Sequence, residues 1–288
     1  MKIAHSPGEL DQRPRAVAIG TFDGVHLGHR AVLSAAMAAG PSATAVTFEP
    51  HPRIAFGYEV ELLTTLERRL ELIGEAGIAE ALVVQFDHEF SQQSPEGFVE
   101  RVLRPIGAEV VVAGGNFRFG RGREGDLETL RELGIDARAV PLVEGVSSSR
   151  IRDLLRAGEI ERAAKLLGRP PELDGPVVSG DARGDTLGFP TANLRLDPQL
   201  LVPAYGIYAG SALDHRAAIS IGTNPHYGGT ERRVEAHLLD YEGDLYGGRL
   251  VVQLWRRLRD EAQFGSEAEL VAQIARDVEE TRAAEPPA

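Results

Sequence analysis

The chain of 288 residues is long enough for two domains that each bury a hydrophobic core. It has no apolar run of about 18 residues that could span a membrane and no apolar signal region at its N-terminus, and its net charge of −12 argues against nonspecific binding to nucleic acid. Because there is no cysteine, disulfides, thiolate metal sites and cysteine nucleophiles are excluded, and a cytoplasmic location is expected.

Strands and helices alternate in the N-terminal half of the sequence. Five short apolar segments are expected to form strands: residues 16–19, 43–47, 81–85, 109–113 and 137–140. Amphipathic helices are expected between them, including residues 30–39, 66–75 and 95–103, the last with Ser94 as its N-cap. This alternation predicts a doubly wound α/β domain, with a parallel sheet covered by helices on both faces. Ligands of such sheets bind beyond the carboxyl ends of the strands.

The segment after the first strand carries the strongest chemical signal. Residues 20–29 read GTFDGVHLGH and place His26 and His29 three positions apart, where a helix is expected to begin. Unpaired backbone N–H groups in a strand–glycine–helix turn can hold a phosphate, and the two histidine rings would add N–H donors on the same side. The alternative is a plain turn whose glycines only let the chain reverse. No Gly-x-x-x-x-Gly-Lys-Ser/Thr motif occurs, so ATP chemistry of the P-loop kind is excluded.

Three further loops follow expected strands: residues 47–52 (TFEPHP), 114–123 (GGNFRFGRGR) and 146–152 (VSSSRIR). In the last loop three serines precede a helix and Arg152 lies one turn into it. Hydroxyls, helix N–H groups and a guanidinium can together bind an anion. Each loop also has an ordinary structural interpretation, because serines cap many helices and arginine-rich glycine loops are usually solvated.

The sequence changes character after residues 168–175 (GRPPELDG), which we interpret as a linker between predicted domains of residues 1–168 and 169–288. Short apolar segments then alternate with glycine turns and predict a small antiparallel β-barrel. They are residues 176–179, 206–212, 217–221, 234–240 and 250–254. A terminal amphipathic helix is expected over residues 266–280, with Ser266 and Glu269 as a capping box and fraying from Arg282 onward.

A second dense motif occupies residues 180–193 (GDARGDTLGFPTAN). Thr191 and Asn193 are two positions apart, so their side chains lie on the same side of an extended segment. A hydroxyl and an amide oxygen, supplemented by ATP phosphates and water, suit Mg²⁺. The alternative is that both side chains satisfy a turn.

The N-terminal motifs resemble those of a known family. Residues 20–29 resemble the His-x-Gly-His signature of the nucleotidyltransferase superfamily and, more narrowly, the adenylylating module of bacterial FAD synthetases. Residues 114–123 and 146–152 resemble two further segments of that module, with Val146 and Ser149 in place of its isoleucine and threonine. Both replacements keep the chemistry of the segment.

The C-terminal motifs resemble the flavokinase half of the same family. The likeness begins with residues 180–193 and continues through residues 219–225 (ISIGTNP), 234–237 (VEAH), 246–247, 258–259 and Phe264. His226 departs from the pattern, because the family often has threonine there. As a whole, residues 15–264 resemble the bifunctional bacterial riboflavin kinase/FAD synthetase family.

By this resemblance, the C-terminal barrel transfers the γ-phosphate of ATP to the 5′-hydroxyl of riboflavin and forms FMN. Glu235 is implied as the general base, since a carboxylate beside metal-bound ATP can accept the hydroxyl proton; judged by its residues alone, it could equally be a surface side chain of a half-buried strand. Thr191 and Asn193 are implied as Mg²⁺ ligands, and Arg259 and Phe264 as neighbours of the flavin. The implied phosphate contacts are Gly180, Arg183, Gly184 and Asn224. His237 is interpreted as structural.

The resemblance also implies that the N-terminal module transfers AMP from ATP to the FMN phosphate and releases pyrophosphate. This reaction needs no protein nucleophile, because the FMN phosphate is already an anion. It needs neutralisation of the triphosphate charge and in-line placement of the reacting groups. The implied catalytic groups are His26, His29 and Arg152, assisted by Ser148 and Mg²⁺. The other implied nucleotide contacts are Gly20, Phe22, Asp23, Gly28, Asn116, Ser147 and Ser149.

Riboflavin, FMN and ATP are therefore the expected partners, and neither nucleic acid nor a membrane is expected. Two alternatives stay open. In the first, only the kinase is active and the adenylylating half has become a binding module. In the second, the chain is a flavin-binding regulator that turns over neither substrate; intact acidic and metal-binding positions argue against it.

Overall fold

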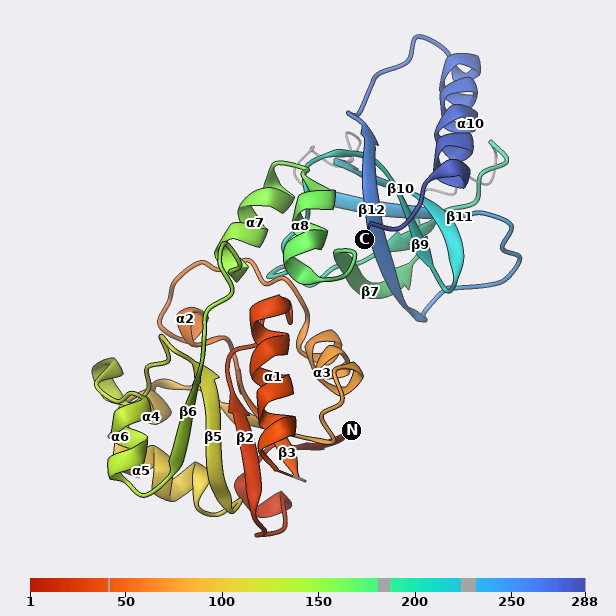
Figure 1. The fold of residues 1–288 in the computed structure, drawn as a ribbon. Helices are drawn as coiled ribbons and strands as arrows, with labels where there is room; N and C mark the ends of the chain where they lie inside the picture. The colour runs from red at the N-terminus through yellow and green to blue at the C-terminus, as the bar shows by residue number, and fades with distance from the viewer. Residues whose placement is uncertain (41, 181–186, 224–231, 288) are drawn as a thin grey trace. The chain divides into compact units, whose positions relative to one another are not determined.

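The computed structural model describes residues 1–40, 42–180, 187–223 and 232–287 (Figure 1). The contacts between its residues divide the chain into two units. The N-terminal unit comprises Met1–Glu61 and Leu66–Ser147, and the C-terminal unit comprises Leu62–Thr65 and Ser148–Ala288. The domain boundary at residue 168 stays a prediction. None of the helices in these described residues is long and apolar enough to cross a membrane.

The N-terminal unit is built on a parallel sheet of six strands in the order β1-β4-β3-β2-β5-β6. The strands are β1 (Lys2–Ala4), β2 (Arg15–Ile19), β3 (Ala43–Glu49), β4 (Glu80–Gln85), β5 (Ala108–Gly114) and β6 (Asp136–Val140). The chain moves outward from β2 through β3 to β4 and then returns to β5 on the other side of β2. The strand order therefore reverses between β2 and β5, and their carboxyl ends frame the crevice where ligands of doubly wound sheets bind.

Helices cover both faces of this sheet (Figure 1). They are α1 (Leu27–Ala39), α2 (Pro52–Ala55), α3 (Leu66–Glu75), α4 (His88–Ser91), α5 (Pro95–Phe98) and α6 (Leu127–Glu132), with the short 3₁₀ helices η1 (Pro7–Glu9) and η3 (Arg121–Arg123) and the π-helix η2 (Val99–Leu103). Strand β2 is buried on both faces: Ala18 joins the core beneath α1 and α3, while Val17 and Ile19 join the core beneath α5, η2 and α6. This alternation is the period of two that a strand imposes on its side chains.

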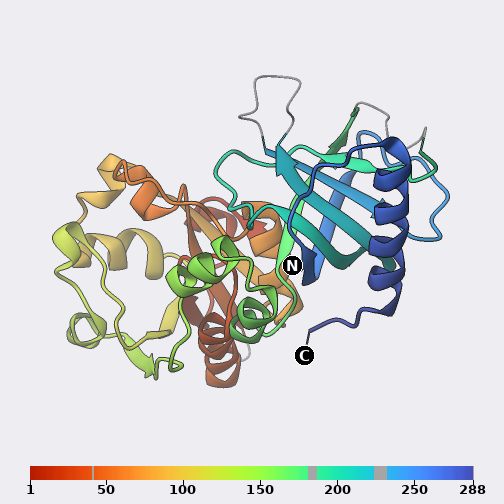
Figure 2. The ribbon, with the colours of Figure 1, turned by 90° about the horizontal axis from the view of Figure 1, so that it is seen from above.

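The C-terminal unit is a closed antiparallel barrel in the order β10-β11-β8-β7-β12-β9. Its strands are β7 (Glu172–Val178), β8 (Ala192–Leu194), β9 (Gly206–Ala212), β10 (His215–Thr223), β11 (Arg232–Leu238) and β12 (Arg249–Arg259). Helices α7 (Ser148–Arg156) and α8 (Ile160–Leu167) share the hydrophobic core of the barrel through Ile151 and Ile160, both fully buried. Helix α10 (Glu267–Ala283) runs along the outside of the barrel (Figure 2).

The predicted fold class is confirmed in both halves, with three local corrections. The proposed linker of residues 168–175 is wrong in its second half, because β7 begins at Glu172 and pairs with β12. The expected capping box is half formed: Ser266 accepts the Glu269 N–H, but the Glu269 carboxylate accepts the Gly265 N–H instead of the Ser266 N–H. Fraying from Arg282 is wrong at its start, since Ala284 is buried and its carbonyl accepts a hydrogen bond from Arg216.

A buried ion pair closes the amino edge of the N-terminal sheet. The Arg15 guanidinium, which is 2% exposed as a residue, donates to the Glu80 carboxylate at 3.1 Å and to the Ile106 carbonyl at 2.6 Å. Arg13 and Thr44 also donate to the Glu80 carboxylate, at 2.9 and 3.3 Å. Burial alone raises the pKa of the Glu80 carboxyl, but the two arginines outweigh it and hold that pKa below its ordinary value of 4.5.

We therefore expect Glu80→Gln to lower the free energy of unfolding of the N-terminal unit by about 1–3 kcal/mol at neutral pH. The substitution removes the negative charge to which the two arginine side chains donate. A carboxyl whose pKa is lowered by folding stabilises the protein above its unfolded-state pKa, and this contribution is lost as pH falls through the lowered folded-state pKa. Denaturant titrations between pH 7 and about pH 3 should show that the variant lacks this part of the acid sensitivity. Glu75→Gln, at a side chain that is 58% exposed, is the control, and equal losses in both variants would contradict the assignment.

Candidate functional site

The loop between β2 and α1 has a strained backbone at the carboxyl end of the central strand. Phe22 has a φ of 51°, a left-handed value that is uncommon for a residue with a side chain, and its ring is fully buried. That ring packs against the backbone of Gly20, where an added Cβ would lie 3.1 Å from it. Asp23 is also buried, with 1% exposure. The glycine at position 20 is thus explained by the close approach of Phe22.

The two histidines of the motif lie together at the start of α1. His26 is the N-cap, and its Nδ1 accepts the backbone N–H of His29 at 3.2 Å. The rings of His26 and His29 stack with centroids 3.6 Å apart and planes inclined by 12°. Gly28 permits this arrangement, because an added Cβ would lie 3.2 Å from the His26 ring. Since Nδ1 of His26 is an acceptor, a neutral His26 ring carries its proton on Nε2.

The helix α1 begins three residues earlier than predicted, and the reason is this cap. The sequence pattern placed the helix at residues 30–39, whereas Leu27 is its first residue. Histidine is not among the common N-caps, so the motif gives no signal of a cap at position 26. The Phe22 ring stands edge-on to His29 at 5.4 Å and completes the packing around the histidine pair.

The loop after β5 lies beside this motif in the sheet order. Asn116 is exposed there, and its amide oxygen lies 3.3 Å from where a Cβ on Gly114 would be. The rings of Phe117 and Phe119 stack at 5.5 Å, and Arg118 pairs with Asp126 at 2.5 Å. Because β2 and β5 are hydrogen-bonded neighbours, the ends of both strands meet at the reversal point of the sheet.

The predicted anion-binding serines and arginine lie at the start of α7. Ser147 precedes the helix, and Ser148 and Ser149 are its first two residues. Arg152 is 7% exposed and follows the fully buried Ile151. The serine segment opens the helix as the sequence predicted, and it belongs to the C-terminal unit from Ser148 onward.

The predicted cation ligand Asn193 has an unusual environment in the barrel. It lies on β8, is 8% exposed, and its Oδ1 has no hydrogen-bond partner among the described residues. Gly180 packs directly on the amide, so that any side chain at position 180 would overlap it. A buried amide oxygen without a donor destabilises a fold. This oxygen therefore fits a cation ligand better than a turn residue, in agreement with the oxygen-rich set predicted for Mg²⁺.

Glu235 is directly opposite Asn193 in the antiparallel ladder between β11 and β8. Its side chain is 28% exposed and accepts a hydrogen bond from Arg233 at 3.2 Å. A partly exposed carboxylate can accept a proton from a substrate, so the position of Glu235 is compatible with its predicted role. Thr191 precedes β8 and is half-buried. Arg183, Gly184, Asn224 and His226 lie outside the described residues.

Arg259 and Phe264 are brought together, with the guanidinium 5.8 Å from the ring centroid. Arg259 also forms a two-pronged ion pair with Asp277 of α10, at 2.9 and 2.7 Å, and donates to the Asp260 carbonyl at 2.9 Å. Three of its five N–H groups are thus used within the protein. No pattern in the sequence indicated the Asp277 partner, which lies 18 residues further along the chain on α10.

Two other side chains near these segments have roles that the structure defines. The Nδ1 of His237 lies 2.7 Å from the Pro190 carbonyl, and its ring stands edge-on to Phe189 at 5.6 Å, which fits a structural role. Glu261, which was not predicted as a site residue, packs on the backbone of Gly222. Burial raises the pKa of the Glu261 carboxyl, and the charge of Arg259 only partly opposes this.

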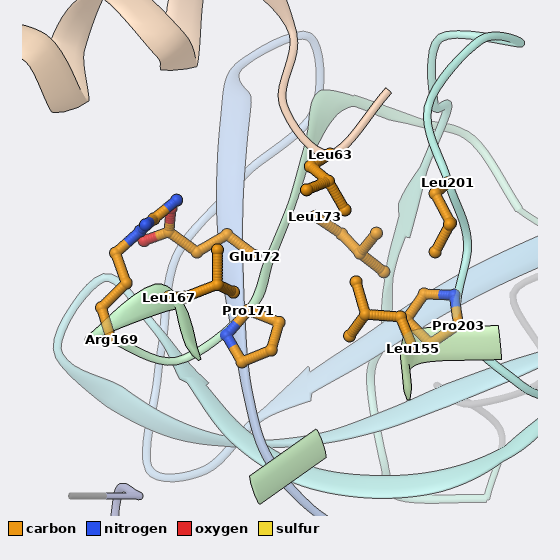
Figure 3. Close-up of a pocket in the computed structure, with 9 residues that line it drawn as sticks. All are labelled: Leu63, Leu155, Leu167, Arg169, Pro171, Glu172, Leu173, Leu201 and Pro203. Carbon is orange, nitrogen blue, oxygen red and sulfur yellow. The ribbon is translucent and has the colours of Figure 1, made fainter. Parts of the chain in front are cut away.

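A cavity in the C-terminal unit lies apart from these groups. It is bounded by α7, α8, β7 and nearby loops, and Figure 3 shows leucine and proline side chains around it with Arg169 and Glu172 on one side. Its volume is about 10 Å³, roughly the space that one water molecule needs. It is a packing gap and is far too small for a flavin or a nucleotide. Among the described residues, no cluster of three histidine, cysteine, aspartate or glutamate side chains could hold a metal ion.

Known proteins match both halves of the chain. The family model described as FAD synthetase matches residues 9–151, and that described as riboflavin kinase matches residues 167–284. Two curated relatives are described as bifunctional riboflavin kinase/FMN adenylyltransferase: that of Listeria monocytogenes is 34% identical over 93% of this chain and 92% of the relative, and that of Escherichia coli K12 is 36% identical over 96% of each. A solved structure from Streptococcus pneumoniae, described as a macrolide-efflux protein, is 30% identical with a TM-score of 0.87 over 98% of this chain and 99% of that one.

The cap geometry yields a stability prediction for His26. We expect His26→Ala to lower the free energy of unfolding of the N-terminal unit by about 1 kcal/mol, because the His29 N–H loses its acceptor. His26→Asn should retain most of that stability, since asparagine is a good N-cap. Chemical denaturation of the full chain, with exposed His88→Ala as the control, distinguishes the two. Equal losses in the alanine and asparagine variants would show that the ring stack, and not the cap, provides the stability.

Proposed function

The chain belongs to the bifunctional riboflavin kinase/FMN adenylyltransferase family, and from that premise we propose which of its residues carry out each reaction. Its C-terminal half phosphorylates riboflavin with ATP to give FMN, and its N-terminal half adenylylates FMN with ATP to give FAD and pyrophosphate. The observation that carries this assignment is the match of both family models in tandem, covering nearly the whole chain.

In the kinase reaction, Glu235 is the general base. As the 5′-hydroxyl oxygen of riboflavin bonds to the γ-phosphorus of ATP, the carboxylate accepts the hydroxyl proton and the bond to the ADP oxygen breaks. The partial exposure of its side chain supports this role, because a substrate can reach the carboxylate. The hydrogen bond from Arg233 orients it.

Asn193 and Thr191 are the proposed ligands of Mg²⁺ in the kinase half. The support is the buried Oδ1 of Asn193, which has no donor among the described residues, and the close packing of Gly180 that holds the amide in place. A bound Mg²⁺ would neutralise charge on the ATP phosphates and orient them. Arg183, Gly184 and Asn224 are proposed phosphate contacts on the strength of the family resemblance.

Phe264 is the proposed flavin neighbour, and Arg259 acts through it. Because the guanidinium is committed to Asp277 and the Asp260 carbonyl, Arg259 has few donors left for a ligand. Its position over the Phe264 ring supports a role in holding that ring for contact with an aromatic substrate.

In the adenylylation reaction, an oxygen of the FMN phosphate attacks the α-phosphorus of ATP and the bond to pyrophosphate breaks. His26 and His29 are the proposed donors to the charge that develops on the phosphates. The stacked rings place two imidazoles side by side at a helix N-terminus, where backbone N–H groups and the helix dipole also favour an anion. Ser148 and Arg152 are proposed to complete the phosphate contacts, and Asn116 to position the nucleotide. Gly20, Phe22, Asp23, Gly28, Ser147 and Ser149 are the remaining proposed nucleotide contacts.

The two activities can be tested with one mixture. Purified protein incubated with riboflavin and Mg-ATP should accumulate FMN first and FAD afterwards, as followed by chromatography. FMN without FAD would mean that only the kinase is active. If neither FMN nor FAD is formed, the flavin-binding regulator becomes the better interpretation.

Single substitutions should separate the reactions. Glu235→Gln should lower the rate of FMN formation by about 100-fold or more, as expected for loss of a general base. FMN that is added directly should still be adenylylated. His29→Ala should do the reverse, because it removes a donor to the phosphates of the other site. The matched controls are exposed residues of the same units, Glu242→Gln and His88→Ala. Loss of both activities in either test variant would refute the division of labour.

The cation assignment predicts an unusual combination of effects for Asn193→Ala. Since Oδ1 has no donor to lose, stability should change by less than about 1 kcal/mol. The Mg²⁺ concentration that gives half the maximal kinase rate should rise about tenfold, because a ligand is lost. Titration of Mg²⁺ at fixed ATP measures this, with adenylylation in the same samples as the internal control. An unchanged Mg²⁺ requirement for the kinase would exclude Asn193 as a ligand.

A further inference from the structure

A fully buried arginine joins the carboxyl ends of β2 and β3. Arg69 belongs to α3 and is 1% exposed. Its Nη1 donates to the Thr21 carbonyl at 3.0 Å and to the Phe48 carbonyl at 3.2 Å, and its Nη2 pairs with the Glu49 carboxylate at 2.5 Å. Burying a guanidinium is costly unless it is paired. Here the charge is matched by Glu49, and the fork of donors is directed at two strand ends.

A second side chain is directed at the same carbonyl. The hydroxyl of Thr47, which is fully buried on β3, donates to the Thr21 carbonyl at 3.1 Å. One backbone oxygen in the loop therefore accepts from a helix and from a neighbouring strand, both through side chains that solvent does not reach. Two donors converging on one carbonyl fix the orientation of the peptide plane to which it belongs.

That peptide plane leads directly into the phosphate-binding motif. In a planar trans peptide the C=O and the following N–H point in opposite directions, so holding the Thr21 carbonyl toward Arg69 turns the Phe22 N–H the other way. Among the described residues the Phe22 N–H has no acceptor. Phe22 also has the left-handed φ of 51°, and its ring stands edge-on to His29 at 5.4 Å. A rotation of this peptide would therefore displace a free donor and the packing of His29 together.

We propose that Arg69 and Thr47 are positioning residues for adenylyl transfer, which act by fixing the Thr21–Phe22 peptide and, through Phe22, the His29 ring. This proposal rests on the proposed function of the β2–α1 loop. Neither residue contacts the histidine rings in the contacts described above. Lysine cannot replace Arg69 fully, because one ammonium cannot reproduce a planar fork that spans two carbonyls and a carboxylate.

The sharpest test compares the same substitution at two ends of one strand. Thr47→Val and Thr44→Val each replace a fully buried hydroxyl on β3 by a methyl of similar size. Thr47 bonds the Thr21 carbonyl, whereas Thr44 bonds Glu80 at the opposite edge of the sheet. We expect Thr47→Val to lower kcat for FMN adenylylation about tenfold while KM for ATP and for FMN change by less than about threefold, since misplacement affects the transition state more than ground-state binding. Thr44→Val should leave kcat unchanged per folded molecule.

Arg69→Lys tests the helix side of the clamp, with Arg68→Lys on the same helix as its control. Arg68, whose side chain is 12% exposed, pairs with Glu71 and Glu75 of the same helix at 2.8 Å. We expect kcat for adenylylation to fall about 30-fold in Arg69→Lys, in line with the cost of a small misplacement, and to stay near the parent value in Arg68→Lys. Riboflavin phosphorylation by the same chain should be unchanged in all four variants, which checks the C-terminal unit, and chemical denaturation checks that the N-terminal unit is folded.

The outcomes distinguish this proposal from the assignment of the site. If His29→Ala abolishes adenylylation while Thr47→Val and Arg69→Lys keep the parent kcat, the site stands and the positioning role is refuted. If His29→Ala itself leaves adenylylation intact, the proposed function of the loop has failed. If Thr47→Val and Thr44→Val lower kcat equally, the effect is one of general stability, and the proposal is again refuted.

Discussion

The position of β2 between β3 and β5 is the constraint on which the N-terminal unit depends. Parallel strands all end at the same edge, and the connections from β2 and β5 leave in opposite directions. The loop after β2 must therefore enter the crevice between them. The strand is buried on both faces, so that neighbouring elements pack against it from both sides. A phosphate-binding turn at this position is anchored by a packed strand, and catalysis by positioning requires such an anchored backbone.

The groups that we propose as phosphate contacts differ in kind between the two halves. In the N-terminal unit the proposed contacts are hydrogen-bond donors, from the start of α1, the two stacked imidazoles and backbone N–H groups. The barrel instead presents oxygen atoms, a buried amide oxygen on β8 and a carboxylate opposite it on β11. Oxygens repel phosphate unless a cation lies between them. This difference in donors and acceptors is the reason that we propose protein ligands for Mg²⁺ in the kinase half.

Glycines of both signatures have a common structural reason. Gly20 accommodates the Phe22 ring, Gly28 the His26 ring, and Gly180 the Asn193 amide. In each case the missing Cβ allows a functional or supporting side chain to lie against the backbone. These glycines, which are predicted as phosphate contacts, therefore have a structural reason of their own, since they let the neighbouring side chains lie close to the backbone.

The sequence by itself determined the fold class, most strands and the two signatures, because periodicity, caps and motif spacing are local properties of the chain. It identified residues 66–75 and 206–212 with the bounds that the structure has, and it placed His26, His29, Asn193 and Glu235 among the site residues. The tertiary structure alone decided what surrounds them. In the sequence, Arg69 looks like any other charged residue of an amphipathic helix. Only in the folded chain does it donate to backbone carbonyls at the ends of β2 and β3. The cap made by His26, the missing donor at Asn193 and the pairing of Arg259 with Asp277 likewise arise only when the chain is folded. Hydrogen bonds between distant residues leave no periodic trace in a single sequence, and for that reason only the folded chain reveals them.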